Sequence, residues 1–176
     1  MRVSLQGKRI LITGASSGIG YATALALSKA GAKVAIGARR VDRLEELAKK
    51  ISADGGEVFY QKLDVTQRSE CENFAKAVLE KWGSIDILVN NAGINKIAPF
   101  VDINPDDFLT IQQVNVFAPF MLCQAAIPAM KKKKWGRIVN ISSIWGKISK
   151  EYRASYSTSK FALDGMTLAL AAEHSV

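Results

Sequence analysis

Short apolar runs alternate with longer amphipathic stretches along the chain, and each pattern predicts one kind of element. The apolar runs are rich in β-branched residues and have the length of strands. They cover Arg9–Thr13, Lys33–Ala38 and residues 57–63, 85–89 and 137–141. The amphipathic stretches predict helices over residues 19–30, 42–53, 66–82, 105–130 and 155–174.

Capping residues and prolines refine these helices. Asp42 and Thr66 are the expected N-caps of the second and third helices, because a short polar side chain accepts a hydrogen bond from the first free N–H groups. Pro119 and Pro128 lie inside the fourth helix and are expected to bend or shorten it.

Strands that alternate with helices at this spacing indicate βαβ units and a parallel sheet. The strand predicted at residues 85–89 is apolar almost throughout, which fits a sheet covered by helices on both faces. The expected fold class is therefore α/β, a doubly wound, Rossmann-like parallel sheet. Such a sheet binds its ligand at the carboxyl ends of the strands.

The composition is that of an ordinary globular domain. The chain has 176 residues, of which 48% are hydrophobic and 23% charged, which favours a single domain over residues 1–176. Residues 1–7 contain no apolar leader, and no apolar run has the length of a membrane span, so a cytoplasmic location is expected. Cys71 and Cys123 have neither metal nor redox spacing and are interpreted as buried thiols, so no metal site is expected.

The formal net charge is +8, which raises the question of a nucleic-acid partner. The basic residues are scattered, however, apart from four lysines at 131–134. That run precedes an apolar strand and is interpreted as a solvated loop or helix end. We therefore do not expect nucleic-acid binding, whereas the same positive field attracts an anionic cofactor or an acidic carrier protein.

A glycine-rich turn joins the first predicted strand to the first predicted helix. It contains Gly14, Ser16, Ser17, Gly18, Ile19 and Gly20. The glycines permit a tight turn and close backbone approach, and the N-terminus of the helix offers free N–H groups to a pyrophosphate. The spacing is Gly-x-x-x-Gly-x-Gly, and its place between a strand and a helix is the context that a dinucleotide-binding motif requires.

The end of the second strand indicates which dinucleotide is preferred. NAD binders carry an acidic residue there, which accepts from the ribose 2′-OH, but this chain has Arg39 and Arg40. A guanidinium group can bind a 2′-phosphate with charge-assisted hydrogen bonds, so NADP(H) is the expected cofactor. Arg39 is favoured for this role and Ser16 can add a hydroxyl, while Arg40 is equally well interpreted as a surface arginine.

Several polar residues follow at the same edge of the predicted sheet. Tyr156 and Lys160 are four positions apart and share one face of the last helix. A cation beside a phenol favours its ionised form, and such a tyrosine can exchange a proton with a carbonyl or alcohol oxygen. Ser143 follows the fifth strand and can donate to a substrate oxygen. Asn115 lies in an apolar helix and needs a buried partner, such as a water or a backbone carbonyl.

Together these motifs resemble the short-chain dehydrogenase/reductase family, in the right order along essentially the whole chain. The resemblance is carried by Thr13-Gly14-x-x-x-Gly18-x-Gly20, Leu63-Asp64-Val65, Asn90-Asn91-Ala92-Gly93, Asn115, Ser143 and Tyr156-x-x-x-Lys160.

The resemblance implies a role for each catalytic residue. Tyr156 would be the acid/base, while Lys160 would favour its ionised form and hold the nicotinamide ribose. Ser143, rather than Ser142, would orient the substrate oxygen, because the family's serine lies thirteen positions before the tyrosine. Asn115 would hold a water in a proton relay from Lys160.

Other residues would contact the adenosine part of the cofactor. Asp64, with Val65 beside it, would contact the adenine, and the segment Asn91, Ala92 and Gly93 would line the ribose. The implied reaction is hydride transfer between NADP(H) and a ketone or secondary alcohol.

Within the family, the chain most resembles 3-oxoacyl-(acyl-carrier-protein) reductases, whose substrate is carried on an acyl carrier protein. Many of those enzymes have a basic residue where this chain has Ser17. A reductase of another small ketone or sugar, and a non-catalytic NADP-binding module, remain as alternatives. The resemblance also implies a homodimer or homotetramer formed through the two long helices.

The chain departs from the family in length. Family members have about 250 residues, a size ordinary for single α/β domains, whereas this chain stops at Val176. We therefore expect a C-terminally incomplete fold that lacks the last strands and the segment covering the substrate. Leu168 and Leu170 would then be poorly covered, and residues 1–176 expressed alone would be unstable or inactive.

Overall fold

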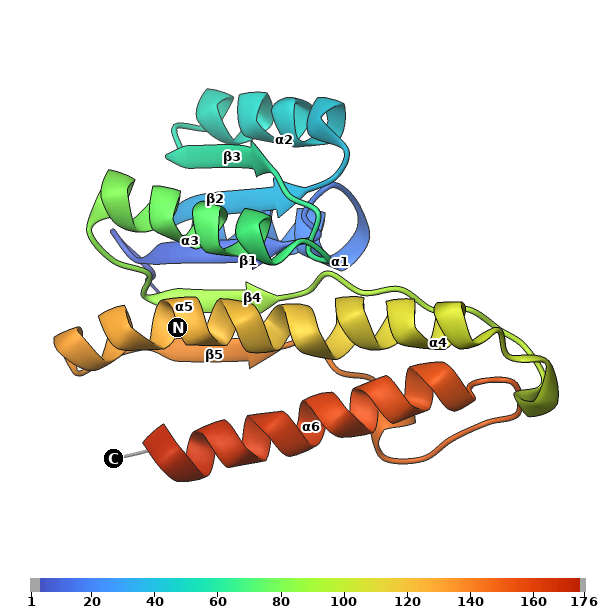
Figure 1. Cartoon of the computed structure of the whole chain (residues 1–176). Coiled ribbons are helices and arrows are strands. Elements are labelled where there is room, and N and C mark those ends of the chain that lie inside the picture. The colour runs from blue at the N-terminus through green and yellow to red at the C-terminus, as the bar shows by residue number, and fades with distance from the viewer. Residues whose placement is uncertain (1–3, 175–176) are drawn as a thin grey trace.

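A computed structural model describes residues 4–174, which form a parallel five-stranded sheet between two layers of helices (Figure 1). The strand order is β3-β2-β1-β4-β5. The strands are β1 (Arg9–Thr13), β2 (Lys33–Ala38), β3 (Val58–Lys62), β4 (Ile87–Asn90) and β5 (Arg137–Asn140). The α/β, Rossmann-like fold class is confirmed. Met1 to Val3, part of the predicted leader-free N-terminus, lie outside the described residues.

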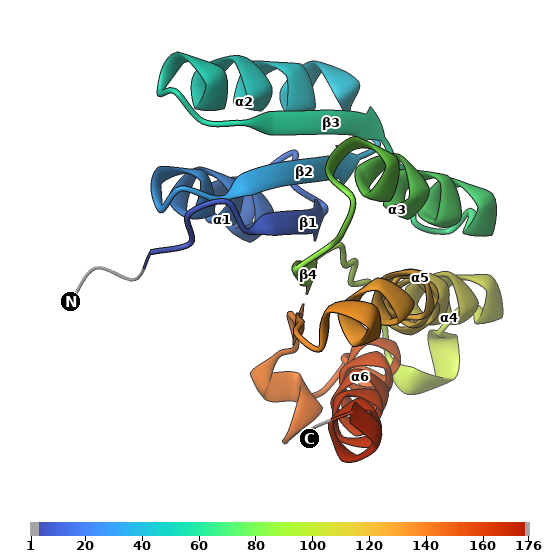
Figure 2. The ribbon, with the colours of Figure 1, turned by 90° about the vertical axis from the view of Figure 1, so that its left-hand side faces the viewer.

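Helices cover both faces of the sheet. The helices are α1 (Gly18–Lys29), α2 (Val41–Ala53), α3 (Arg68–Trp82), α4 (Pro105–Gln112), α5 (Ala118–Lys133) and α6 (Ala154–His174). Figure 2 shows α1 on one side of the sheet and α3, α4 and α5 on the other, with α6 beside α5 at the β5 end.

Alternate residues of the central strands supply two cores. Leu11 and Leu88 point into a core shared with α3 and α5, whereas Ile10 and Val89 point into a core shared with α1 and α2. All four side chains are at most 4% exposed. This is the reason why the strands are apolar almost throughout, since successive side chains point to opposite faces.

The expected N-caps of α2 and α3 are wrong. Arg40 precedes α2, and Asp42 lies inside its first turn, where a carboxylate still interacts favourably with the helix dipole. The N-cap of α3 is Gln67, without a side-chain hydrogen bond. Thr66 instead donates its backbone N–H and its hydroxyl to Asp64, so the predicted capping residue is used by a turn.

Neither proline ends the long fourth helix. Pro119 lies in the first turn of α5, and the helix continues past Pro128 to Lys133. The irregularity lies before both prolines, at a π-helical turn over Gln113–Phe117 that joins α4 to α5.

By length and composition alone, the helix over Pro105–Lys133 could cross a membrane, a possibility that the sequence analysis did not anticipate. Half of its most apolar stretch is buried against the rest of the chain. It packs on the sheet beside α3 (Figure 1). A core helix of this kind passes the same test, so the evidence for a membrane span is weak.

Among the described residues, β5 forms one edge of the sheet. Val139 on this strand is 43% exposed. On the neighbouring helix α6, Leu168 is 70% exposed, as expected from the sequence. Leu170 was expected to be exposed as well, but it is partly buried against the core that α3 and α5 share.

A charge cluster around the buried Asp86 joins the start of β1, the residue before β4 and the end of α5. The Asp86 side chain is 1% exposed and accepts from Arg9 Nε at 2.7 Å and from Arg9 Nη2 at 3.1 Å. Lys133 Nζ donates to Asp86 Oδ1, the oxygen that also accepts from Arg9 Nη2. Burial alone raises the pKa of Asp86, but these hydrogen bonds outweigh burial and lower it to about 2. The lysine run therefore ends α5, as expected, with one member committed to this cluster.

We predict that Asp86→Asn lowers the free energy of unfolding by about 3 kcal/mol at pH 7, because it removes the buried carboxylate that accepts from Arg9 and Lys133, whose side chains are 23% and 37% exposed. The folded-state pKa lies below the unfolded value of about 3.9. The stabilisation is therefore present above about pH 4 and is lost as the pH falls toward 2. Urea unfolding of the full-length protein at several pH values measures both effects. Glu72→Gln, which breaks the exposed ion pair with Arg68, is the control and should cost less than about 1 kcal/mol.

Candidate active site

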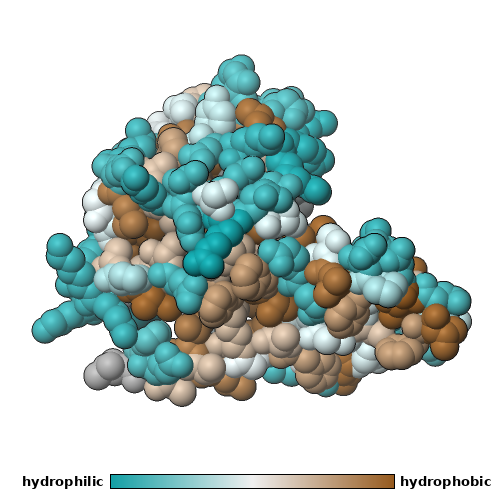
Figure 3. All heavy atoms as spheres, in the orientation of Figure 1, coloured by the Kyte–Doolittle hydropathy of each residue, from teal (hydrophilic) through white to brown (hydrophobic). Residues whose placement is uncertain are grey.

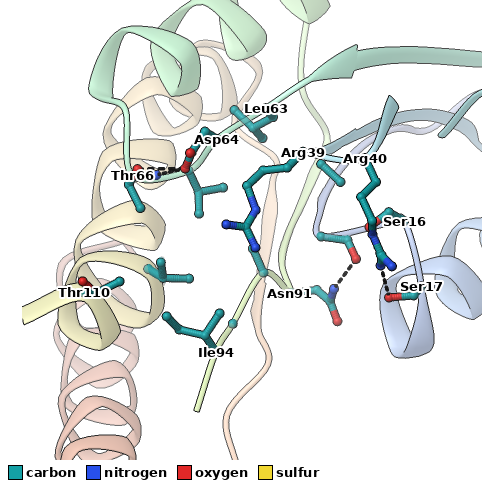
Figure 4. Close-up of a pocket in the computed structure, with 16 residues that line it drawn as sticks. Ser16, Ser17, Arg39, Arg40, Leu63, Asp64, Thr66, Asn91, Ile94 and Thr110 are labelled. Carbon is teal, nitrogen blue, oxygen red and sulfur yellow. Dashed lines mark hydrogen bonds between the residues drawn. The ribbon is translucent and has the colours of Figure 1, made fainter. Parts of the chain in front are cut away.

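A pocket of about 370 Å³ opens at the carboxyl ends of the strands (Figure 4). Its walls come from the turn after β1, the end of β2, the segment after β3, the segment after β4, and α4 with the π-helical turn. The predicted cofactor residues that line it are Gly14, Ser16, Ser17, Arg39, Arg40, Asp64, Val65, Asn91, Ala92 and Gly93. The structure thus gathers residues from four separate motifs around one cavity.

The glycines of the first turn permit close packing behind this pocket. Gly14 has a φ of +67°, and a Cβ atom there would lie 2.8 Å from Ala92 Cα. A Cβ atom on Gly20 would lie 2.6 Å from the Gly14 carbonyl oxygen. Gly18 and Ile19 begin α1, whose first N–H groups have no partner in the helix. These three predicted residues, 18 to 20, shape the turn without lining the pocket.

Asn91 holds the glycine turn against the end of β4. Its side-chain amide donates to the carbonyl oxygens of Thr13 (2.9 Å) and Gly14 (3.2 Å). The Thr13 hydroxyl in turn accepts from the backbone N–H groups of Asn91 and Ala92 at 3.1 and 3.0 Å. The amide of Asn91 is therefore committed to positioning the turn, while its segment lines the pocket.

Two arginines reach the pocket from the end of β2. Arg40 Nη2 donates to the hydroxyls of Ser16 (3.0 Å) and Ser17 (2.6 Å). Arg40, for which a surface role was equally possible, thus lies directly over the serines of the turn (Figure 4). Arg39 extends over the middle of the pocket (Figure 4). Both side chains are exposed at the mouth of the pocket.

Asp64 forms the wall on the β3 side. It accepts from the Thr66 hydroxyl at 2.8 Å and from its backbone N–H at 3.0 Å. Burial raises the pKa of Asp64, but these hydrogen bonds and the nearby charges of Arg39 and Lys62 hold it below its usual value. The carboxylate is therefore ionised at neutral pH.

Tyr156 and Lys160 lie in the first two turns of α6. Lys160 Nζ is 5.5 Å from the centre of the Tyr156 ring and donates to the Ile141 carbonyl oxygen at 2.7 Å. Lys160 is only 4% exposed. Burial lowers the pKa of Lys160, and the negative charge of Asp164 opposes this shift. Ser143 follows β5, two residues after Ile141, and its hydroxyl accepts from the Trp145 N–H at 3.2 Å.

Asn115 has the buried partner that the sequence analysis called for. Its side-chain oxygen accepts from the Ile94 N–H, and its NH₂ group donates to the Ile94 carbonyl oxygen and to the Ser159 hydroxyl, all at 2.9 Å. Asn115 lies in the π-helical turn, a feature that occurs frequently at functional sites. A Cβ atom on neighbouring Gly93 would lie 3.4 Å from Asn115 Oδ1 and 3.9 Å from Lys160 Nζ.

Some site residues were not found from the sequence. Ser159 is fully buried, and its hydroxyl donates to the Tyr156 carbonyl oxygen at 2.6 Å, so it joins Asn115 to α6. Its position just before Lys160 was the available signal. Ile94, Thr110 and Val114 line the far wall of the pocket, but no motif marks them.

Comparisons with known proteins agree with this arrangement. A family model described as short chain dehydrogenase matches residues 8–176. The chain is 38% identical to the 3-oxoacyl-[acyl-carrier-protein] reductase FabG of Thermotoga maritima, over 96% of this chain and 69% of that protein. It is also 38% identical to a short chain dehydrogenase of Pseudocercospora fijiensis, over 96% of this chain and 55% of that protein.

Solved structures have the same fold. A metagenomic short-chain oxidoreductase, crystallised in complex with NADP, superposes with a TM-score of 0.93 at 38% identity. The match covers 97% of this chain and 78% of that one. The chain thus spans little more than half of one curated relative and about two thirds of another.

The close approach behind the pocket can be tested by Gly20→Ala. We predict that it lowers the free energy of unfolding by about 1 to 3 kcal/mol, because the methyl group would collide with the Gly14 backbone. Gly165→Ala is the matched control, since Gly165 is also helical but has open space around it. The control should be neutral or stabilise by about 0.5 to 1 kcal/mol. Equal thermal stabilities of the two variants would contradict the close packing.

Proposed function

The chain belongs to the short-chain dehydrogenase family of oxidoreductases, and on that premise we propose that its protein transfers a hydride between NADP(H) and a ketone or secondary alcohol. The observation that carries the proposal is the placement of Tyr156 beside the buried ammonium group of Lys160, which lies near Gly93 in the wall of the pocket. Asn115 also lies beside Gly93, and Ser143 follows Ile141, whose carbonyl oxygen accepts from Lys160. These four residues border the pocket region but do not themselves line the pocket.

The residues present fit an NADP(H) molecule. The glycine turn lines the pocket at Gly14, Ser16 and Ser17, and the free N–H groups of α1 suit the pyrophosphate. Arg40 with the two serine hydroxyls, and Arg39 beside them, supply donors for a 2′-phosphate. The relative crystallised with NADP supports this assignment.

The remaining lining residues would hold the rest of the cofactor. Asp64 and Val65 would border the adenine, and the segment of Asn91, Ala92 and Gly93 would border the ribose. Lys160 would hold the nicotinamide ribose from its place beside Gly93.

The chemistry divides between cofactor and protein. The nicotinamide supplies or accepts the hydride when it is bound. Tyr156 gives a proton to the carbonyl oxygen during reduction, and takes it back from the alcohol during oxidation. The ammonium group of Lys160 lies 5.5 Å from the centre of the ring that exchanges this proton. The Ser143 hydroxyl donates to the substrate oxygen as charge develops on it.

Asn115 supports the return of a proton to Tyr156 after the reaction. Its side chain is fully engaged with Ile94 and Ser159, so it fixes the π-helical turn beside Lys160. We propose that a water held at this turn returns a proton to Lys160 and from there to Tyr156.

For the substrate, we propose a 3-oxoacyl chain, presented on an acyl carrier protein. The similarity to FabG supports it, and the net charge of +8 favours an acidic carrier. Reduction of another small ketone or a sugar is the alternative. A panel of 3-oxoacyl thioesters, simple ketones and sugars, assayed with NADPH, distinguishes these substrate classes.

We propose further that the protein is a homodimer or homotetramer in the cytoplasm. Large apolar side chains stay exposed along the π-helical turn, α5 and α6: Phe117, Phe120, Phe161 and Leu168 are 40% to 70% exposed. Figure 3 shows apolar residues gathered over the part of the molecule where these helices lie. An apolar surface of this kind favours association with another copy.

Tyr156→Phe should lower kcat for ketone reduction by about 100-fold or more, because it removes the proton that the carbonyl oxygen receives. NADPH affinity should change little. Tyr60→Phe, on the outer strand β3, is the control and should leave kcat unchanged. Steady-state kinetics of the full-length protein measures both variants. Unchanged turnover in Tyr156→Phe would remove this residue from the mechanism, whereas a lack of turnover in the unmodified protein would favour the non-catalytic module.

Arg39→Asp and Arg40→Asp should each lower the ratio of kcat/KM with NADPH to kcat/KM with NADH by at least about tenfold, because a carboxylate repels the 2′-phosphate. Arg43→Asp, whose side chain points along α2 to Glu46, should leave the ratio near its original value. If neither substitution at the pocket lowers the ratio, the 2′-phosphate binds elsewhere.

A further inference from the structure

The segment that follows β5 is held against α6 at three points. At its start, the Ile141 carbonyl oxygen accepts from Lys160 Nζ at 2.7 Å. Near its end, Gly146 packs so closely that a Cβ atom would lie 3.1 Å from the Lys160 carbonyl oxygen. At Lys147, the ammonium group lies 3.1 Å from Asp164 Oδ2. Ser143 lies between these points, so its position depends on how the segment is fixed.

Asp164 takes part in two of these contacts. The same Cβ atom on Gly146 would lie 2.8 Å from Asp164 Oδ2 and 3.0 Å from the Ser142 hydroxyl, so the carboxylate borders the segment directly. The Asp164 side chain is 20% exposed, whereas that of Lys147 is 73% exposed. Burial raises the pKa of Asp164, but Ser142, Lys147 and Lys160 together hold it below its usual value. Asp164 is therefore ionised at neutral pH.

Asp164 also faces Lys160, one helical turn earlier on α6. Burial lowers the pKa of Lys160, and the charge of Asp164 is the influence that opposes this. On the other sides of Lys160 lie the Tyr156 ring on α6, the Ile141 carbonyl on the segment, and Gly93 after β4. Lys147 approaches from the segment but is paired with Asp164.

We propose that Asp164 is a positioning residue of the reaction centre, which fixes the Ser143 segment on α6 and balances the buried charge of Lys160. The part of this role that concerns catalysis rests on the function proposed above. A displacement of about 1 Å in a reaction centre can cost about 100-fold in rate. A carboxylate that joins the serine segment to the lysine turn thus controls the geometry on both sides of the substrate oxygen.

Two variants separate the two parts of this role. Asp164→Asn keeps the size of the side chain but removes its charge, so it weakens the attachment of the segment and leaves Lys160 unbalanced. Lys147→Met weakens the attachment but leaves the carboxylate beside Lys160. Asp164→Glu keeps the charge. Lys76→Met is the matched control, because Lys76 is also 73% exposed and pairs with Glu80 on the remote helix α3.

Hydrogen exchange of the full-length protein measures how firmly the segment after β5 is held on α6, and it needs no turnover. Peptides covering residues 142–153 should exchange faster in Asp164→Asn and in Lys147→Met, and at the original rate in Lys76→Met. Unchanged exchange in both of the first two variants overturns the proposal. This readout stands even when no substrate has been found, so a failure of the proposed function is distinguishable.

The pH profile of kcat tests whether the charge of Asp164 balances that of Lys160. Asp164→Asn should lower kcat by about tenfold with a smaller change in KM. The basic limb of its profile should move to lower pH, since removing the carboxylate lowers the pKa of Lys160 further. Lys147→Met and Asp164→Glu should keep the limb in place. A limb that does not move in Asp164→Asn, or that moves equally in Lys147→Met, overturns this part of the role.

Discussion

The burial of one ammonium group determines how the two halves of the site meet. Lys160 is almost inaccessible, and burial lowers its pKa. The Ile141 carbonyl oxygen accepts from its ammonium group, and the charge of Asp164, one turn away, opposes the lowering of the pKa. A buried charge without such partners would cost several kcal/mol. To provide them, α6 must pack against the end of β5. That packing brings the tyrosine and serine segments together at the carboxyl edge of the sheet.

Local patterns account for most of the fold that could be predicted. The central strands were found because burial on both faces makes them apolar almost throughout, and the glycine turn because positive φ and close approach demand glycine. The N-caps were wrong because Thr66 serves Asp64 rather than the helix. No local propensity expresses that competition, since both uses of a threonine satisfy the same rule.

The unpredicted parts of the site depend on contacts between distant segments. The π-helical turn is one such part. Another is the hydrogen bond from Asn115 to Ser159, which joins residues 44 positions apart and is revealed only by the tertiary packing. Arg40 was ambiguous because an exposed arginine after a strand is ordinary. Its hydrogen bonds to Ser16 and Ser17 place its exposed side chain on the glycine turn, and its role toward a 2′-phosphate stays a prediction.

The residues that line the pocket and those proposed for catalysis occupy different stretches of the chain. The lining of the pocket comes from residues between Gly14 and Val114, and the residues proposed for catalysis after β5 and on α6 come later. In the proposed reaction, recognition of the phosphate and delivery of the proton are thus encoded in successive stretches. Exchanging the first stretch between relatives would then alter the cofactor preference and leave Tyr156 and Lys160 unchanged.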